Sequence, residues 1–272
     1  MLFRPLGLAF FLLTAAVPAL AAPAAELWPR WEKFTAGSAA SVDHGAWNAF
    51  LATYVRPVDG VNLVDYGAVD AAAQAALDGY IQMLAATDID GLDRPQQMAL
   101  WINLYNAVTV RLIVDNYPLD SIRDLGGLFS SPWGKKLVTV AGEDLSLDDI
   151  EHRILRPIWR DPRIHYAVNC ASVGCPNLAA EAYEAERLDG QLDAAARAYV
   201  NHPRGAEVLG DGLVVSKIYD WYQVDFGGSE AGVISHLKQF AAPPLAKMLT
   251  GVSGVADYRY DWALNDAPGG AG

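Results

Sequence analysis

Apolar residues recur at helical spacing in several stretches of the chain. They do so across residues 26–55, through the alanine-rich stretch 71–86, and again over 188–201 and 233–240. Apolar positions three and four residues apart form one face of an α-helix, so each stretch predicts one or two helices whose apolar face packs on a core. The intervening residues 57–66 lack this spacing and predict a connector.

The stretch between Pro95 and Pro118 is apolar on nearly every side, which predicts a central, buried helix. Proline suits the first turn of a helix and cannot continue one, so the two prolines mark its limits. Asn103 and Asn106 lie on one face of this helix. An unsatisfied buried amide costs about 1 to 3 kcal/mol, so both need partners. They tie down a neighbouring loop, which we favour, or they line a pocket.

Alternating apolar and polar residues predict a few strands. Residues 136–141 and 145–147 are predicted to form one hairpin, and 207–216 a second one around a Gly-Asp-Gly turn. Residues 257–263 alternate with aromatic side chains on one face, which predicts a late strand. The expected fold is therefore α+β, a mostly helical single domain packed on a small, mainly antiparallel sheet.

A further helix is predicted between Ser146 and Pro157. Ser146 is a suitable N-cap, the acidic residues after it favour a helix N-terminus, and Pro157 ends the pattern. His152 lies four residues after Asp148, so a carboxylate can hold its imidazole. Two interpretations stay open: a surface or half-buried histidine that closes a hydrogen bond, and a histidine that takes part in chemistry.

Residues 165–176, HYAVNCASVGCP, hold both cysteines of the chain. The apolar run IHYAV predicts a buried strand, and the small residues after it predict a loop that begins at Cys170. A thiol at a strand end lies beside free backbone N–H groups, which can stabilise its thiolate. Alternatively, Cys170 and Cys175 form a disulfide. A zinc site would need two more ligands, and no second CxxC or HxxxH spacing supplies them, so we expect no metal and no cofactor.

The first 21 residues combine Arg4, an apolar run and small residues at the end. This arrangement is typical of a secretory signal peptide, cleaved here near Ala21 or Ala22. The apolar run is short for a membrane span. We therefore expect a periplasmic or secreted protein with no stable membrane insertion after cleavage. An oxidising compartment favours a bridge between the two cysteines, whether reversible or permanent.

Composition limits the partners and the number of domains. The chain has 32 acidic and 20 basic residues and a formal net charge of −12, which disfavours nucleic acid as a partner. Apolar residues make up 52%, enough for a sizeable core. No repeat or linker marks a boundary, so residues 22–266 predict one domain, followed by a flexible tail at 267–272. The remaining partner is an unidentified small molecule or peptide.

Five separated blocks carry a resemblance to a known family: LWINLYNA, LDDIEHRILR, HYAVNCASVGCP, SKIYDWYQVDFG and YRYDWALN, in this order. From roughly Tyr66 to Asn265 the chain resembles the bacterial domain-of-unknown-function 547 family. The resemblance implies no reaction, because the family takes its name from lacking an established one. The recurring polar positions of the family correspond here to Asn103, Asn106, Glu151, His152, His165, Cys170 and Cys175, all of which the chain retains.

Three functions follow from these residues, and the first is a thiol-dependent hydrolase or acyl transferase. Acyl transfer needs a nucleophile, a base, a group that orients the base and an oxyanion donor. The candidate nucleophile is Cys170, and the candidate base is His152 or His165. The group that orients the base is Glu151 or Asp220, with Asp225 as a further possibility. The oxyanion donor is Asn103 or Asn106, and Tyr105 and Trp221 are secondary residues. Papain-like enzymes carry the cysteine far upstream of the histidine, so a distant papain-like or transglutaminase-like similarity requires a rearranged fold.

The second function is a thiol–disulfide redox protein. Four residues separate the cysteines instead of two, and no thioredoxin-like pattern surrounds them, so we rank it below the hydrolase. The third is a non-catalytic binding domain in which a structural disulfide stiffens the loop and aromatic segments 219–226 and 258–262 form a recognition surface. The catalytic hypothesis requires the Cys170 sulfur, an imidazole and the two asparagine amides to meet in one cleft.

Overall fold

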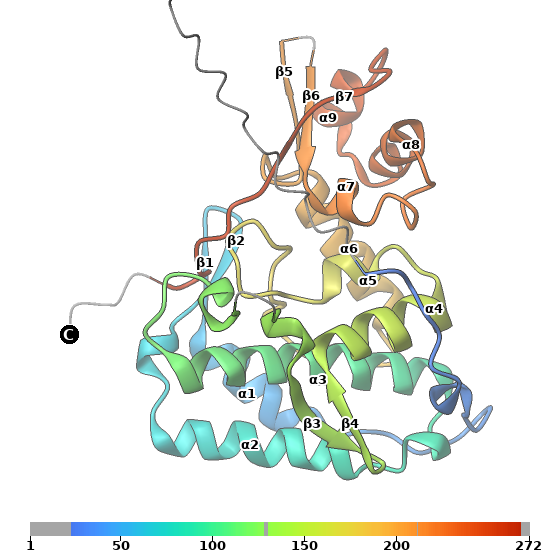
Figure 1. The fold of residues 1–272 in the computed structure, drawn as a ribbon. Helices are drawn as coiled ribbons and strands as arrows, with labels where there is room; N and C mark the ends of the chain where they lie inside the picture. Colours follow the sequence, from blue (N-terminus) through green and yellow to red (C-terminus); the bar gives the residue numbers. More distant parts are fainter. Residues whose placement is uncertain (1–22, 128–129, 211, 268–272) are drawn as a thin grey trace, which may run out of the picture.

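The computed structural model describes residues 23–127, 130–210 and 212–267 (Figure 1). The predicted signal peptide lies outside these residues, as does the predicted tail apart from Ala267. Among the described residues, none of the helices combines the length and the apolar character that a membrane span requires.

Three helices form the lower half of the molecule in Figure 1: α1 (Gly45–Tyr54), α2 (Ala71–Ala86) and α3 (Arg94–Asn116). The predictions for α2 and for the central helix α3 are confirmed. Asp70 and Asp93 cap the two helices by accepting backbone N–H bonds in the first turn. Every side chain of α3 from Gln96 to Val110 is buried, as its nearly continuous apolar surface predicts.

The segment predicted as a connector forms a hairpin instead. Strands β1 (Val55–Val58) and β2 (Val61–Val64) pair antiparallel. Asp59 and Gly60 between them take positive φ values of 48° and 80°, which allow a tight two-residue reversal. The connector prediction for residues 57–66 was wrong because it missed the Asp-Gly turn signal between two valine-rich segments.

The second hairpin and the helix after it follow the prediction more closely. Strands β3 (Lys136–Val140) and β4 (Glu143–Ser146) pair antiparallel. A π-helix, η6 (Asp149–Leu155), comes next and continues as α4 (Arg156–Trp159). Ser146 caps it, because its hydroxyl accepts the Asp149 N–H at 3.1 Å. Pro157 does not end the helix; it lies in the first turn of α4, directly after the π-helix, and the helix ends at Trp159.

The predicted strand before Cys170 is a helical turn, α5 (Ile164–Ala167). Backbone bonds from Ile164 to Asp161 and from His165 to Pro162 close this turn, and the chain becomes extended at Val168. Periodicity cannot separate a short buried strand from a short buried helix, and here the preceding Asp-Pro turn starts a helix.

The upper half of the molecule contains a three-stranded sheet with order β5-β6-β7 (Figure 1). Its pair β5–β6 is antiparallel, as predicted, whereas β7 runs parallel to β6. The predicted late strand lies two residues earlier than expected and ends before its last aromatic residues. The elements of this half are α6 (Leu188–Val200), β5 (Ala206–Leu209), β6 (Gly212–Ser216), α7 (Ile218–Trp221), α8 (Glu230–Phe240), α9 (Pro243–Met248) and β7 (Val255–Arg259).

The α+β class is confirmed, with three small, mostly antiparallel sheets among the described residues in place of one. Short helical turns complete the fold: η1 (Pro29–Glu32), η2 (Tyr66–Ala68), η3 (Ile89–Gly91), η4 (Ile122–Leu125) and η5 (Pro132–Gly134). The assignment of residues 22–266 to one domain stays a prediction.

Two hydrophobic clusters make up the core, and the cysteine loop lies where they meet. One cluster surrounds α3 and includes Val168 before the cysteines, Ala171 between them and Leu178 after them. The other surrounds the three-stranded sheet and includes Tyr166. After β7 the chain descends from the upper half to the lower (Figure 1), where Leu264 pairs with Ser172. The C-terminal residues thus line the cysteine loop.

Candidate dithiol site

Two asparagines of α3 hold the loops around the cysteines. The Asn106 amide donates to the Ala167 carbonyl at 2.9 Å and accepts the Asn169 N–H at 2.8 Å. Asn103 makes the same pair of bonds with the backbone of Tyr183, at 2.8 and 3.0 Å. The loop-tying interpretation is confirmed. Each amide therefore uses its oxygen and one N–H to hold backbone groups of a neighbouring loop.

The far side of the cysteine loop is fixed by its contact with the C-terminal segment. Gly174 donates its N–H to the Asp261 carbonyl at 2.9 Å. A Cβ on Gly174 would lie 2.6 Å from the Asp261 nitrogen, so only glycine permits this approach. The guanidinium of Arg204 donates to the carbonyls of Val173 and Cys175, each at 3.0 Å. The loop is therefore held on both sides.

The two sulfur atoms lie 2.9 Å apart and belong to free thiols. A disulfide bond is about 2 Å long, so the predicted bridge is not formed in this structure. The separation follows from the backbone: Ala171 takes a left-handed φ of 57°, and the Cys175 N–H bonds to the Ser172 carbonyl. The chain thus turns back on itself and brings Cys175 against Cys170.

The environments of the two thiols differ. Cys170 is half-buried and Cys175 is buried. Burial raises the pKa of the Cys170 thiol, but hydrogen bonds with Cys175, with the Tyr260 hydroxyl at 2.9 Å and with the Ser172 hydroxyl at 3.6 Å outweigh burial and lower it. Burial and the neighbouring Cys170 raise the pKa of Cys175 well above its usual value. The negative charge therefore belongs on Cys170, and Cys175 keeps the proton.

A buried ionic cluster is centred on His165. Its Nε2 lies 2.7 Å from Asp225 Oδ2, and its Nδ1 lies 3.5 Å from Glu151 Oε1. The ring stacks on Tyr222 with 4.2 Å between centroids. Burial lowers the pKa of His165, but its bonds to Asp225 and Glu151 raise it above the usual value. The imidazolium is therefore favoured between two carboxylates.

His152 belongs to the same cluster but differs in charge. Its Nδ1 accepts a hydrogen bond from the Arg156 guanidinium at 3.0 Å. Burial, followed by the charges of Arg156 and His165, lowers the pKa of His152 despite the opposing effect of Glu151. The predicted partner Asp148 lies 3.7 Å from Nε2. The neutral ring of His152 is therefore favoured, first by burial and then by the charge of Arg156.

The structure places the ionic cluster near the thiols without joining them. Among the described residues, no hydrogen bond links the Cys170 sulfur to His152 or His165. The charge of Glu151 nevertheless raises the pKa of the Cys170 thiol, and both groups raise the pKa of buried Tyr105. The thiols and the imidazoles are neighbours rather than a hydrogen-bonded pair.

Several site residues differ from the sequence-based expectation. Of the two acids expected to orient a histidine, Asp225 contacts His165, whereas Asp220 is exposed. Trp221 packs on Tyr260, with 4.9 Å between ring centroids. Tyr260 was not predicted as the partner of Cys170, because 90 residues separate them and no local pattern relates them. Arg156 was not predicted either, although its spacing of four residues from His152 indicates a contact.

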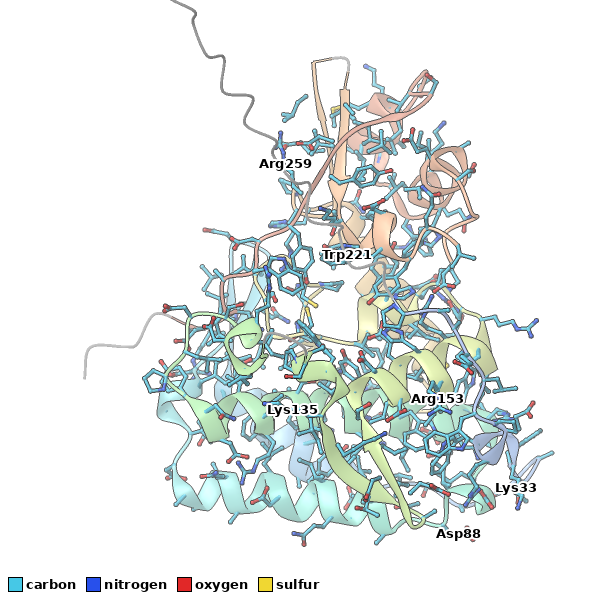
Figure 2. All side chains as sticks on the ribbon, viewed as in Figure 1. Lys33, Asp88, Lys135, Arg153, Trp221 and Arg259 are labelled. Carbon is cyan, nitrogen blue, oxygen red and sulfur yellow. The ribbon has the colours of Figure 1, made fainter. Side chains whose placement is uncertain are left out.

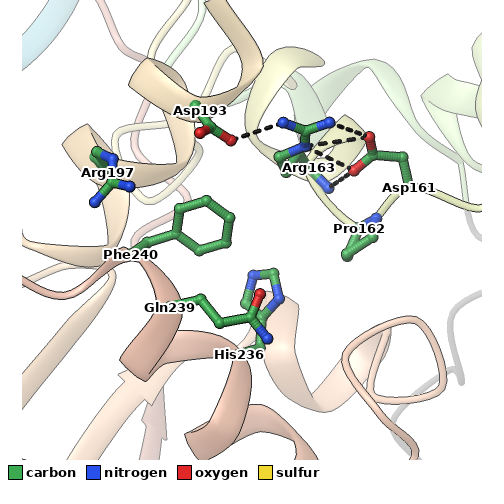
Figure 3. Close-up of a pocket in the computed structure, with 8 residues that line it drawn as sticks. All are labelled: Asp161, Pro162, Arg163, Asp193, Arg197, His236, Gln239 and Phe240. Atoms are coloured by element: carbon green, nitrogen blue, oxygen red, sulfur yellow. Dashed lines mark hydrogen bonds and ion pairs between the residues drawn. The ribbon is translucent and has the colours of Figure 1, made fainter. Parts of the chain in front are cut away.

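Two cavities lie elsewhere. One of about 400 Å³ lies between α6 and α8 (Figure 3), and one of about 390 Å³ lies against α2, α3 and β3. Cys170 lines neither of them, so neither is the predicted shared cleft. Among the described residues, no three His, Cys, Asp or Glu side chains are grouped as a metal site would require. The first cavity is lined by Asp161, Arg163, Asp193, Arg197, His236 and Phe240, among others.

Comparison with known proteins identifies a family. Residues 89–200 match the family model described as "Protein of unknown function, DUF547", which confirms the family expected from the sequence blocks. The match includes α3, the ionic residues of η6 and the cysteine loop. Searches of curated proteins and of solved structures returned no match. The similarity to papain-like or transglutaminase-like enzymes stays a prediction.

Proposed function

Because residues 89–200 match the DUF547 family, whose description names no activity, we propose a function from the geometry of the thiols. The protein is a thiol–disulfide exchange protein in which Cys170 attacks and Cys175 resolves. The observation that carries the proposal is the 2.9 Å separation of two free thiols whose pKa values are shifted in opposite directions. A half-buried thiolate beside a fully buried, protonated thiol is the arrangement that such exchange needs.

The exchange balances without any further cofactor. The Cys170 thiolate attacks one sulfur of a substrate disulfide; the new bond joins Cys170 to that sulfur, and the other substrate sulfur leaves as a thiolate that takes up a proton. Cys175 then gives up its proton and attacks Cys170, which closes the Cys170–Cys175 bond and releases the second substrate thiol. Two electrons pass from the protein to the substrate. A second dithiol substrate restores the reduced pair by the reverse steps.

This proposal places the redox function above the hydrolase, whereas the sequence alone favoured the hydrolase. A spacing of four residues between cysteines argued against redox chemistry, but the turn at Ala171 brings the sulfurs together. Acyl transfer needs a base and oxyanion donors at the sulfur. The amides of Asn103 and Asn106 bond to backbone groups of neighbouring loops, and among the described residues no hydrogen bond joins either imidazole to the Cys170 sulfur. Exchange uses only groups that touch the sulfur.

We also propose that the protein works outside the cytoplasm, in the periplasm or after secretion. The support is the signal-like composition of residues 1–21. An exported location supplies disulfide-containing substrates. Mass spectrometry of the protein from its native host tests this proposal; a mature chain that begins near Ala22 is expected, and an intact residue 1 in the mature protein contradicts it.

The redox proposal is tested by equilibration in buffers of reduced and oxidised glutathione, followed by alkylation and mass spectrometry. Wild-type protein is expected to gain and lose one internal bond reversibly. Cys175→Ala is expected to accumulate a single glutathione adduct on Cys170, because nothing resolves it. Cys170→Ala is the matched control, in which the buried Cys175 reacts slowly.

Two outcomes overturn the redox proposal. A bond that forms and then resists excess dithiothreitol in the folded protein indicates a structural disulfide and the binding-domain alternative. A pair that stays reduced at every glutathione ratio, combined with hydrolysis of a thioester that needs Cys170 but not Cys175, indicates the hydrolase instead.

A further inference from the structure

Four half-buried aromatic rings form a continuous surface beside Cys170, which we call the aromatic platform: Trp133, Trp221, Tyr260 and Trp262. The ring centroids of Tyr260 and Trp262 are 4.5 Å apart, and those of Trp221 and Trp262 are 5.5 Å apart. Trp133 extends the platform on the other side of Trp262, at 5.8 Å. Tyr260 joins the platform to the thiol, because its hydroxyl contacts the Cys170 sulfur at 2.9 Å.

The platform is assembled from three separate parts of the chain. Trp133 comes from η5, Trp221 from the end of α7, and the other two rings from the segment after β7. Figure 2 shows Trp221 where the upper and lower halves of the molecule face each other. Because rings from both halves meet here, the platform has a fixed place relative to the cysteine loop.

Trp262 is not explained by core packing. Trp133 packs on the lower hydrophobic cluster, and Trp221 and Tyr260 pack on the upper one, but Trp262 belongs to neither. Its ring touches the other platform rings and lies 5.2 Å from the exposed Arg123 guanidinium. Half-exposed aromatic rings that contribute little to a core are typical of binding surfaces, where they supply large contact areas at low entropic cost.

We propose that the aromatic platform binds a segment of polypeptide substrate that carries an apolar or aromatic side chain next to the disulfide undergoing exchange. The inference rests on the proposed redox function and names its substrate class. A substrate disulfide must reach the Cys170 sulfur, and Tyr260 places that sulfur at the edge of the platform. A segment bound across the rings therefore presents its disulfide to the thiolate.

Glutathione fits the surface less well than a polypeptide does. It is small, it has no apolar side chain to cover the rings, and it carries two carboxylates. A protein with a formal net charge of −12 does not attract such an anion. A neutral or basic segment with an apolar residue beside its cysteine matches both the rings and the overall charge.

The binding test uses the double variant Cys170→Ser/Cys175→Ser, which cannot exchange, and follows its tryptophan fluorescence. Two short synthetic disulfide peptides without tryptophan are compared, one with phenylalanine and one with glycine beside each cysteine. The phenylalanine peptide is expected to bind at least about tenfold more tightly, on the scale of one buried aromatic contact. Equal binding of the two peptides overturns the proposal, and this comparison requires no change in the platform.

A platform variant gives the second readout. Adding Trp262→Ala to the double variant is expected to weaken binding of the phenylalanine peptide by about tenfold or more. Adding Trp159→Ala instead, a half-buried tryptophan of α4 outside the platform, should leave the affinity unchanged. If both additions weaken binding equally, the effect is general and the platform is not the binding surface.

Exchange rates separate failure of the platform from failure of the redox function. Wild-type protein is expected to reduce the phenylalanine peptide faster than the glycine peptide by a similar factor in kcat/KM. Exchange with oxidised glutathione but no preference between the peptides overturns the platform and leaves the redox function standing. Selective peptide binding without exchange overturns the redox function, and with it the assignment of the peptide as a redox substrate.

Discussion

The hydroxyl of Tyr260 lies 2.9 Å from the sulfur of Cys170, across a separation of 90 residues in the chain. This contact is one of three hydrogen bonds that lower the pKa of the thiol against the opposing effect of burial. A phenol is a good donor to a thiolate, and its own pKa is raised well above 10 by burial and by Cys170. The proton therefore stays on the tyrosine while the charge stays on the sulfur.

Removing that donor should make the thiol less reactive. In Tyr260→Phe the pKa of Cys170 is expected to rise, so that iodoacetamide alkylates it several-fold more slowly near neutral pH, on the order of a lost charge-assisted hydrogen bond. The measurement is the pH dependence of the alkylation rate, followed by mass spectrometry. Tyr258→Phe removes a hydroxyl from a half-buried tyrosine of β7 and should leave the rate unchanged. Equal rates for wild type and Tyr260→Phe contradict the assigned role.

Asn106 is expected to contribute to stability rather than to chemistry. Asn106→Ala leaves the Ala167 carbonyl and the Asn169 N–H without their partner in the interior. The free energy of unfolding should fall by about 2 to 4 kcal/mol, the combined cost of two unsatisfied backbone groups. Denaturant unfolding measures this loss. Asn116→Ala, at the exposed end of the same helix, is the matched control and should cost less than about 1 kcal/mol.

Glycine at position 174 is required by the contact with Asp261. In Gly174→Ala the added carbon would meet backbone atoms at 2.6 and 2.8 Å, so the two segments must separate. Unfolding should become easier by about 1 to 3 kcal/mol, and alkylation of Cys170 should slow because Tyr260 moves with its neighbour. Gly190→Ala on α6, where no atom lies within 4 Å, should instead be neutral or slightly stabilising. A Gly174→Ala protein as stable and reactive as wild type contradicts this account.

Acid should destabilise the fold through Glu151. Burial raises the pKa of this carboxyl, but the charges of His165, of Arg156 and of His152 once acid protonates it, with a hydrogen bond from His165, overcome burial and lower the pKa from 4.5 to about 2. Its stabilising effect is complete above pH 4.5 and is lost as the pH falls through 2. The unfolding free energy should therefore drop across that interval, on the order of 3 kcal/mol for this group. Denaturant unfolding at a series of pH values measures the decrease.

The variant Glu151→Gln checks the assignment of the acid effect. It removes one group that titrates, so the decrease between pH 4.5 and 2 should become shallower, leaving the share due to Asp149 and Asp225, whose pKa values are also lowered to about 2. His165 acts in the opposite direction. Its raised pKa stabilises the fold below pH 6.5, and that contribution is lost as the pH rises through the folded value. If the unfolding free energy of Glu151→Gln falls between pH 4.5 and 2 as steeply as that of the wild type, other carboxyl groups cause the acid destabilisation.

The two long helices of the lower half were predictable from strong local sequence patterns. The helix over residues 71–86 and the buried helix that begins near Pro95 were predictable because many residues repeat the same spacing. The loop-tying role of Asn103 and Asn106 was predictable for another reason: a buried amide must be satisfied, and backbone groups of neighbouring loops are its commonest partners.

The thiol site was only partly predictable. Sequence order placed both cysteines in one loop, but the sulfur separation depends on the left-handed backbone at Ala171, an unusual conformation for a residue other than glycine. The helical turn α5 was mistaken for a strand because four apolar residues have no distinguishing period. The contact with Tyr260 depends on β7 pairing parallel to β6, a long-range arrangement that no local signal encodes.

The course of the chain after β7 determines when the reactive thiol forms during synthesis and folding. A ribosome synthesises Cys170 and Cys175 well before Tyr260, which follows 90 residues after the first of them. Until residues 260–265 dock against the cysteine loop through Val173, Gly174 and Leu264, the thiol lacks its phenolic donor. The nascent polypeptide thus carries two ordinary cysteines, and the reactive sulfur arises only when its last segment is in place.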